Sequence, residues 1–207
     1  MGLILCIETG TDICSVALAR DGEMIALRES DLGKDHARKV GVFTQELLRE
    51  NNIEPDELDA VAVGKGPGSY TGLRIGVSFA KGLCYALGIP LVAIDSLRSL
   101  SACLAEEVEA GILDIEDWDE AALCPMIDAR RMEVYAELFD TKLNPLSEVV
   151  AEVVTDRSFY DILLTHKKLV IFGNGAQKCC EVLSDAIYVS VTPSARGIVA
   201  LAEQAFN

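Results

Sequence analysis

The stretch LILCIETGTDICSVALARDGEMIALRES, residues 3–30, contains three strand patterns in close succession. Residues 3–9, 14–20 and 23–30 are each rich in aliphatic side chains, which is typical of strands in a buried or half-buried sheet. Asp21 and Gly22 separate the second pattern from the third, and this dipeptide is a strong signal of a two-residue hairpin turn. The stretch therefore predicts three consecutive antiparallel strands.

A helix and then alternating strands and helices are predicted after these strands. Apolar residues with the 3.6-residue spacing of a helix are Ala37, Val40, Phe43, Leu47 and Leu48. Pro55 ends this pattern. The strand, helix, strand and helix that follow are predicted at residues 59–64, 71–88, 91–94 and 96–110. Ser96 is the predicted N-cap of the last of them.

The second half repeats this order after an acidic stretch, residues 113–120, that resembles a linker. Its predicted strands are residues 122–129, 133–140, 146–154, 169–172 and 187–189. Its predicted helices begin at Asp156, at Ala176 and at Thr192-Pro193, where threonine would be the N-cap and proline the first helical residue. The order βββαβαβα thus occurs twice. This is a duplicated ribonuclease-H-like α/β fold, typical of the actin, sugar-kinase and heat-shock-chaperone superfamily, with predicted domains at 1–112 and, smaller, at 113–207.

Composition limits the functions that the chain can have. Half of its 207 residues are hydrophobic and its mean hydropathy is +0.27, but no apolar run approaches the roughly 20 residues of a membrane span. The beginning of the chain does not resemble a signal peptide, so we expect a soluble, cytoplasmic protein with seven reduced and mostly buried cysteines. The formal net charge of −15 repels a phosphate backbone, and any contact with RNA must be arranged by another protein.

Nucleotide-binding parts, which this superfamily shares, are only partly present. Glu8, Gly10 and Thr11 stand where its members place a carboxylate and a phosphate-binding turn. In the second half the corresponding turn, residues 128–131, carries side chains in place of the glycines that would admit a phosphate. Gly173 and Gly175 could support an adenosine, although a turn between a strand and a helix needs glycine for structural reasons as well.

Other catalytic motifs are less complete. Residues 64–72, GKGPGSYTG, open a helix, but the lysine precedes the glycines and the stretch is no P-loop. The two histidines are His36 and His166, and the helical position that would pair His36 with a second ligand holds Val40. No metal, cofactor or catalytic residue is predicted, and no Ser-His-Asp or Cys-His spacing favours a protease. An ATP-dependent kinase of the superfamily remains the alternative.

The glycine-rich stretch also carries a family resemblance. Residues 66–76, GPGSYTGLRIG, closely resemble the signature of the TsaB (YeaZ) family. Supporting matches are residues 4–18, His36, and residues 127–137, IDARRMEVYAE. Together these matches cover roughly residues 3–140, with Glu8 in place of the aspartate usual in the family.

The resemblance implies a subunit and not an enzyme. Proteins similar to TsaB pair with the metal-bearing transferase TsaD, and the ATPase TsaE completes a bacterial complex that installs threonylcarbamoyl on tRNA. The enzyme TsaC makes the adenylate that the complex consumes. By this resemblance the chain is a non-catalytic partner of TsaD and TsaE, forms a homodimer, and meets tRNA only through the complex.

The helix at residues 71–87 is the predicted association surface. Its polar residues Arg74, Ser78, Lys81 and Tyr85 fall within an arc of about 60°. Gly72, Gly76, Ala80 and Cys84 recur every four residues and form a ridge along which another helix could approach. The alternative is that this ridge seats the helix on its own sheet. The predicted interface comprises Thr71, Gly72, Arg74, Ile75, Gly76, Phe79, Ala80 and Leu83, with His36, Val40 and Phe43 of the preceding helix.

Overall fold

A computed structural model describes residues 2–30, 35–163, 165 and 168–207, and the predicted His166 lies outside them. Its contacts divide the chain into two compact units, Met1–Ser99 with Pro193–Asn207, and Leu100–Thr192. The predicted boundary lies at 112, whereas the contacts change units after Ser99, and the C-terminal helix joins the first unit because it packs on the first sheet. None of the described helices has the length and apolar character needed to cross a membrane.

The first unit contains the predicted sheet. Its strands are β1 (Leu3–Glu8), β2 (Cys14–Arg20), β3 (Glu23–Ser30), β4 (Ala60–Gly64) and β5 (Leu91–Ile94), in the order β3-β2-β1-β4-β5. The pairs of β1 with β2 and of β2 with β3 are antiparallel, whereas β4 pairs in parallel with β1 and with β5. The three antiparallel strands predicted from residues 3–30 are therefore confirmed.

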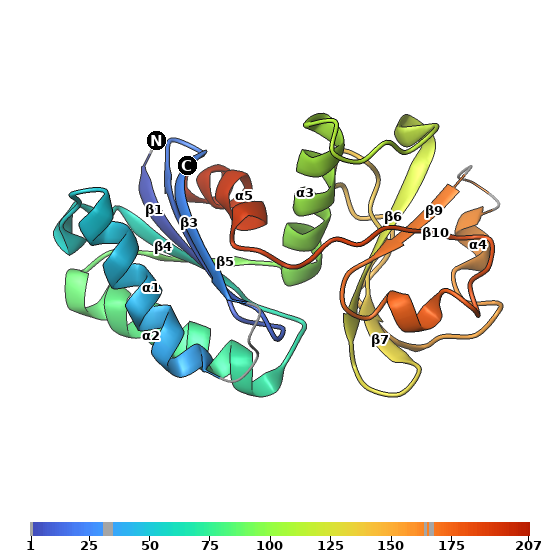
Figure 1. The fold of residues 1–207 in the computed structure, drawn as a ribbon, viewed down its shortest axis with the longest axis horizontal. Coiled ribbons are helices and arrows are strands. Elements are labelled where there is room, and N and C mark those ends of the chain that lie inside the picture. The colour runs from blue at the N-terminus through green and yellow to red at the C-terminus, as the bar shows by residue number, and fades with distance from the viewer. Residues whose placement is uncertain (1, 31–34, 164, 166–167) are drawn as a thin grey trace. The chain divides into compact units, whose positions relative to one another are not determined.

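Helices cover both faces of this sheet (Figure 1). Helices α1 (His36–Glu50) and α2 (Tyr70–Leu87) pack on one face, over a core that includes Leu5, Leu18 and Val63. On the opposite face α5 (Arg196–Phe206) contacts all five strands. The helix α3 (Ser96–Glu109) and the 3-10 turn η1 (Pro55–Glu57) complete the elements of the chain before residue 110.

The last helix begins at Arg196, three residues after the predicted Pro193. The amide of Ala195 donates a hydrogen bond of 2.8 Å to Ser15 Oγ on β2, so the segment before the helix is attached to the first sheet. This contact joins residues 180 positions apart in the chain, and no local capping pattern could indicate it.

The second unit repeats the topology of the first. Its strands are β6 (Ala121–Asp128), β7 (Glu133–Ala136), β8 (Val150–Val153), β9 (Lys168–Phe172) and β10 (Ile187–Tyr188), in the order β10-β9-β6-β7-β8. Because β6 pairs antiparallel with β7 and parallel with β9, it corresponds to β1. The predicted duplication of the α/β order is confirmed for the strands.

The helices after residue 112 that belong to the second unit are shorter than predicted. They are α4 (Tyr160–Leu163) and the 3-10 turns η2 (Trp118–Glu120) and η3 (Gln177–Cys179). The prediction of a helix from Ala176 is wrong, because most amides there bond to carbonyls three residues earlier, as from Cys179 to Ala176 and from Ala186 to Leu183. All seven cysteines are free, and all but the half-buried Cys180 are buried.

Candidate functional site

The carboxylate of Glu8 connects three segments of the first unit. Glu8 ends β1 and is 2% exposed. Its Oε1 accepts a hydrogen bond from the amide of Gly10 at 2.7 Å, and its Oε2 accepts one from Ser96 Oγ at 3.0 Å. Ser96 Oγ in turn accepts a bond from the amide of Gly66 at 3.3 Å. The carboxylate thus links the turn after β1, the loop after β4 and the start of α3.

Two glycines make room for this carboxylate. A Cβ atom on Gly64 would lie 2.2 Å from Glu8 Oε2, and one on Gly10 would lie 2.9 Å from Oε1. Thr11, the third predicted nucleotide contact of this turn, is buried and its carbonyl bonds to His36. Contacts within the first unit therefore explain all three residues, and this favours a structural role of the turn over nucleotide binding.

The buried Glu8 should make stability depend on pH. Burial raises the pKa of its carboxyl above the ordinary 4.5, while the hydrogen bonds from Gly10 and Ser96 act in the opposite direction. The folded state then binds the proton more tightly than the unfolded state, so this contribution to stability is complete below pH 4.5 and is lost as the pH rises through the folded pKa.

Glu8→Gln stays neutral and should avoid this loss. We expect its free energy of unfolding to increase relative to that of the parent as the pH rises above 4.5. Urea unfolding at a series of pH values measures the difference, with the exposed Asp12→Asn as the control for removing one negative charge from the same turn. A difference between Glu8→Gln and the parent that does not change with pH would contradict the expectation.

The motif at residues 66–76 attaches α2 to the end of β1. Ser69 is the N-cap of α2, its Oγ accepts from the amide of Gly72 at 3.3 Å, and its own amide donates to the carbonyl of Gly10 at 2.6 Å. Thr9 Oγ1 donates to the carbonyl of Gly72 at 2.9 Å. The peptide bond between Gly66 and Pro67 is cis. The motif is therefore part of the structural core of this unit.

The ridge of small residues on α2 faces its own sheet. Gly72, Gly76, Ala80 and Cys84 are the buried residues of this helix. A Cβ atom on Gly72 would lie 2.0 Å from the carbonyl oxygen of Thr9, and one on Gly76 would lie 2.2 Å from Thr9 Oγ1. The prediction that this ridge contacts a partner is wrong, because these glycines are needed for the close approach of α2 to β1.

The remaining apolar residues of α2 are covered by their own unit. Ile75, Phe79 and Leu83 are half-buried against the core beneath α1 and α2, together with Phe43 of α1. A Cβ atom on Gly41 of α1 would lie 3.7 Å from the ring of Phe79, so the two helices are in direct contact there. The apolar residues of α2 beside the ridge therefore pack within their own unit, against α1 and the core beneath it.

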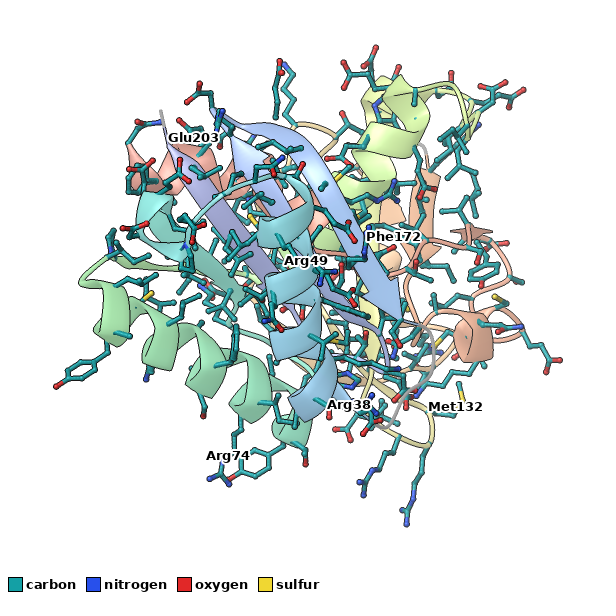
Figure 2. All side chains as sticks on the ribbon, turned by 60° about the vertical axis from the view of Figure 1, so that its left-hand side comes forward. Arg38, Arg49, Arg74, Met132, Phe172 and Glu203 are labelled. Atoms are coloured by element: carbon teal, nitrogen blue, oxygen red, sulfur yellow. The ribbon has the colours of Figure 1, made fainter. Side chains whose placement is uncertain are left out.

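The exposed part of α2 is its polar arc. Tyr70 is 75% exposed and Tyr85 is 91% exposed. Arg74 extends away from the helix (Figure 2), with its guanidinium 5.3 Å from the centre of the Tyr70 ring and Nη1 donating to Tyr70 Oη at 3.3 Å. The exposed residues of this arc, called here the α2 outer surface, are Tyr70, Thr71, Arg74, Ser78, Lys81 and Tyr85.

His36 and Val40 of the predicted interface are buried. His36 Nε2 lies 2.8 Å from the carbonyl oxygen of Thr11, and because a carbonyl only accepts, Nε2 carries the proton. His36 also lines a cavity of about 210 Å³ together with Asp12, Ser69 and other residues at the starts of α1 and α2. It thus attaches the start of α1 to the turn after β1.

The corresponding turn of the second unit is closed by side chains. Asp128 ends β6, its amide donates to Asn174 Oδ1 at 3.0 Å, and its carboxylate is paired with Lys178. A Cβ atom on Gly173 would lie 2.5 Å from the carbonyl oxygen of Met126, and one on Gly175 would lie 3.0 Å from the amide of Asp128. Both glycines allow the turn after β9 to pass close to β6. This favours a structural reason for them over a role in binding adenosine.

Several residues of these turns were not predicted from the sequence. The sequence predicts Ser96 as the N-cap of α3. In the structure Asp95 caps α3 by accepting hydrogen bonds from the amides of Leu97 and Arg98, and Ser96 Oγ bonds to Glu8 instead. Lys178 has no role predicted from the sequence. Within the described ranges, no group of three His, Cys, Asp or Glu side chains is arranged to hold a metal ion.

Comparisons with known proteins relate this geometry to a family. Residues 30–159 match the family described as TsaD, tRNA N6-adenosine threonylcarbamoyltransferase. The tRNA threonylcarbamoyladenosine biosynthesis protein TsaB of Bacillus subtilis is 36% identical over 149 residues, which are 72% of this chain and 60% of the relative. The chain spans about half the length of the curated relatives that it matches.

Solved structures support the fold. YeaZ from Pseudomonas aeruginosa has a TM-score of 0.77 at 23% identity, covering 100% of this chain and 92% of that chain. The polyphosphate/ATP-glucomannokinase of an Arthrobacter strain has a TM-score of 0.51 at 9% identity, covering 100% of this chain and 98% of that chain. These likenesses show the duplicated α/β fold that sugar kinases share.

Proposed function

Because this chain belongs to the TsaB (YeaZ) family, we propose that it is a non-catalytic subunit of the complex that makes threonylcarbamoyladenosine in tRNA. The match of residues 30–159 to the TsaD family supports the proposal. The partners of this chain are a TsaD transferase, the ATPase TsaE and a second copy of itself in a homodimer, and it meets tRNA only through the complex. The complex works in the cytoplasm.

The packing of the motif at residues 66–76 carries this proposal. The glycines of the motif hold α2 against the end of β1, and this leaves the α2 outer surface exposed for a partner. The donors that could serve a phosphate at the same turn are already engaged, since the Gly10 amide and the Ser96 hydroxyl bond to Glu8. This geometry supports a binding role over a kinase, and no observation specifically favours the kinase alternative.

Reconstitution tests the proposal. The chain and a TsaD from the same organism, mixed at micromolar concentrations, should elute together from a sizing column. Modified tRNA should form only when the chain, TsaD, TsaE and the adenylate are all supplied. The chain alone should not hydrolyse ATP steadily, because the donors of the turn after β1 are engaged by Glu8. It should also not bind tRNA in a salt-sensitive manner, because its net charge is −15. Failure of two folded proteins to associate, or tRNA modified by this chain alone, would refute the proposal.

A further inference from the structure

Two adjacent arginines occupy the tip of the turn between β6 and β7. Arg130 has a φ of +76° and Arg131 a φ of +48°, so both lie in the left-handed backbone region that residues other than glycine rarely adopt. Met132, labelled in Figure 2, follows them directly. A turn that needs positive φ at two positions would form with less strain if it contained glycine or asparagine. Backbone strain of this kind is typical of functional positions, where the side chain itself is needed.

Hydrogen bonds on both sides hold this turn in place. The amide of Ala129 donates to the carbonyl of Glu133 at 3.1 Å, and the amide of Glu133 donates to the carbonyl of Arg130 at 3.0 Å. Lys178 Nζ donates to the carbonyl of Glu133 at 2.7 Å. The backbone that carries the two arginines is thus fixed by its own strand pair and by a residue from η3.

Neither guanidinium is neutralised within the described part of the chain. Both arginines are exposed, and within the described residues neither guanidinium forms an ion pair or a hydrogen bond with another residue. Arg130 is bonded to Asp128 only through its backbone amide, which donates to Asp128 Oδ1 at 3.3 Å. Asp128, one of the two acidic residues that flank the arginines in the sequence, pairs with Lys178 instead. A chain with 33 acidic and 18 basic residues therefore presents two adjacent uncompensated cations at a fixed position.

We propose that Arg130 and Arg131 contact phosphate groups of the tRNA backbone when tRNA is bound by the complex, an inference that rests on the proposed function. The planar guanidinium matches a phosphate with two parallel hydrogen bonds. A protein partner would be expected to bury apolar side chains at such a contact, whereas none of the large exposed hydrophobic residues lies in residues 128–133. Two contacts are too few to hold RNA against the charge of the whole chain, so they act only once TsaD has bound the tRNA.

The test measures tRNA binding by the assembled complex as a function of salt. The parent is compared with Arg130→Asn/Arg131→Asn, and asparagine is chosen because it tolerates a positive φ. Loss of two phosphate contacts should reduce the slope of log K against log salt by about 1.4 to 1.8, at about 0.7 to 0.9 per contact. Binding at physiological salt should weaken by roughly 10-fold. The same variant should melt no lower than the parent, because its turn is less strained.

A matched variant controls for net charge. Lys142→Asn/Arg157→Asn removes the same two charges from exposed positions in other loops of this unit, and it should leave the slope close to that of the parent. If the parent chain and TsaD form no active complex, the proposed function fails. If the Arg130 and Arg131 variant forms an active complex whose salt slope equals that of the parent, the phosphate contact is refuted. If this variant loses TsaD or TsaE before tRNA is added, the arginines bind a protein and the inference is likewise overturned.

Discussion

Gly72→Ala should destabilise the first unit by about 3 kcal/mol, at the upper end of what overpacking costs. The added Cβ atom would lie 2.0 Å from the carbonyl oxygen of Thr9. This oxygen belongs to the backbone that leaves β1, and Ser69 and Gly72 are themselves bonded to the same turn. The strain therefore cannot be relieved by turning a side chain, and α2 must move away from the sheet.

Gly82→Ala on the same helix is the matched control. No heavy atom lies within 4 Å of the position that a Cβ atom on Gly82 would take. Alanine is favoured over glycine inside a helix by about 0.8 to 1 kcal/mol, so this substitution should stabilise the protein. Urea unfolding followed by circular dichroism measures both variants. If Gly72→Ala proved as stable as the parent, Gly72 would not be needed for the close approach of α2 to β1.

Arg74→Glu should weaken binding to TsaD by about 2 kcal/mol, or roughly 30-fold in Kd, without affecting the fold. Arg74 is exposed at the α2 outer surface, where its guanidinium lies over the Tyr70 ring. Arginine and tyrosine are among the residues that most often dominate binding at protein interfaces. Reversing the charge removes the ring contact and places a carboxylate where the partner would meet a cation.

Arg20→Glu makes the same change of charge at a distant part of the first sheet. Arg20 is exposed at the end of β2 that pairs with Leu3, whereas α2 begins near the other end of β1. Binding of labelled protein to TsaD, followed by fluorescence anisotropy, should distinguish Arg74→Glu from this control. If a folded Arg74→Glu protein binds TsaD as tightly as the parent does, the contact lies elsewhere on the molecule.

The buried ridge of α2 and the α2 outer surface should respond differently to substitution. Ala80, which the pattern of small residues places in the predicted interface, is 0% exposed and belongs to the core under α1 and α2. Substitutions of the ridge should therefore reduce stability before they affect binding, whereas substitutions of the α2 outer surface should do the reverse.

The sequence by itself determined the strands and their order. The aliphatic runs and the Asp21-Gly22 turn are local features, and the strand pairing of both sheets follows from the order of the elements. The motif at residues 66–76 was likewise recognisable because its spacing lies within one short stretch. Local patterns of this kind are set by neighbouring residues, which is why they can be interpreted without a structure.

Only the tertiary structure decided which way the helices face and which sheet they cover. Helical spacing placed Gly72, Gly76 and Ala80 on one line, but the same spacing serves a partner or the protein's own sheet, and the bond between Thr9 and Gly72 joins residues 63 positions apart. The contact of Glu8 with Ser96 spans 88 positions, and the contact that attaches the last helix to the first sheet spans 180. Such contacts form because distant segments compete to bury the same apolar surface, and a single sequence does not record the outcome of that competition.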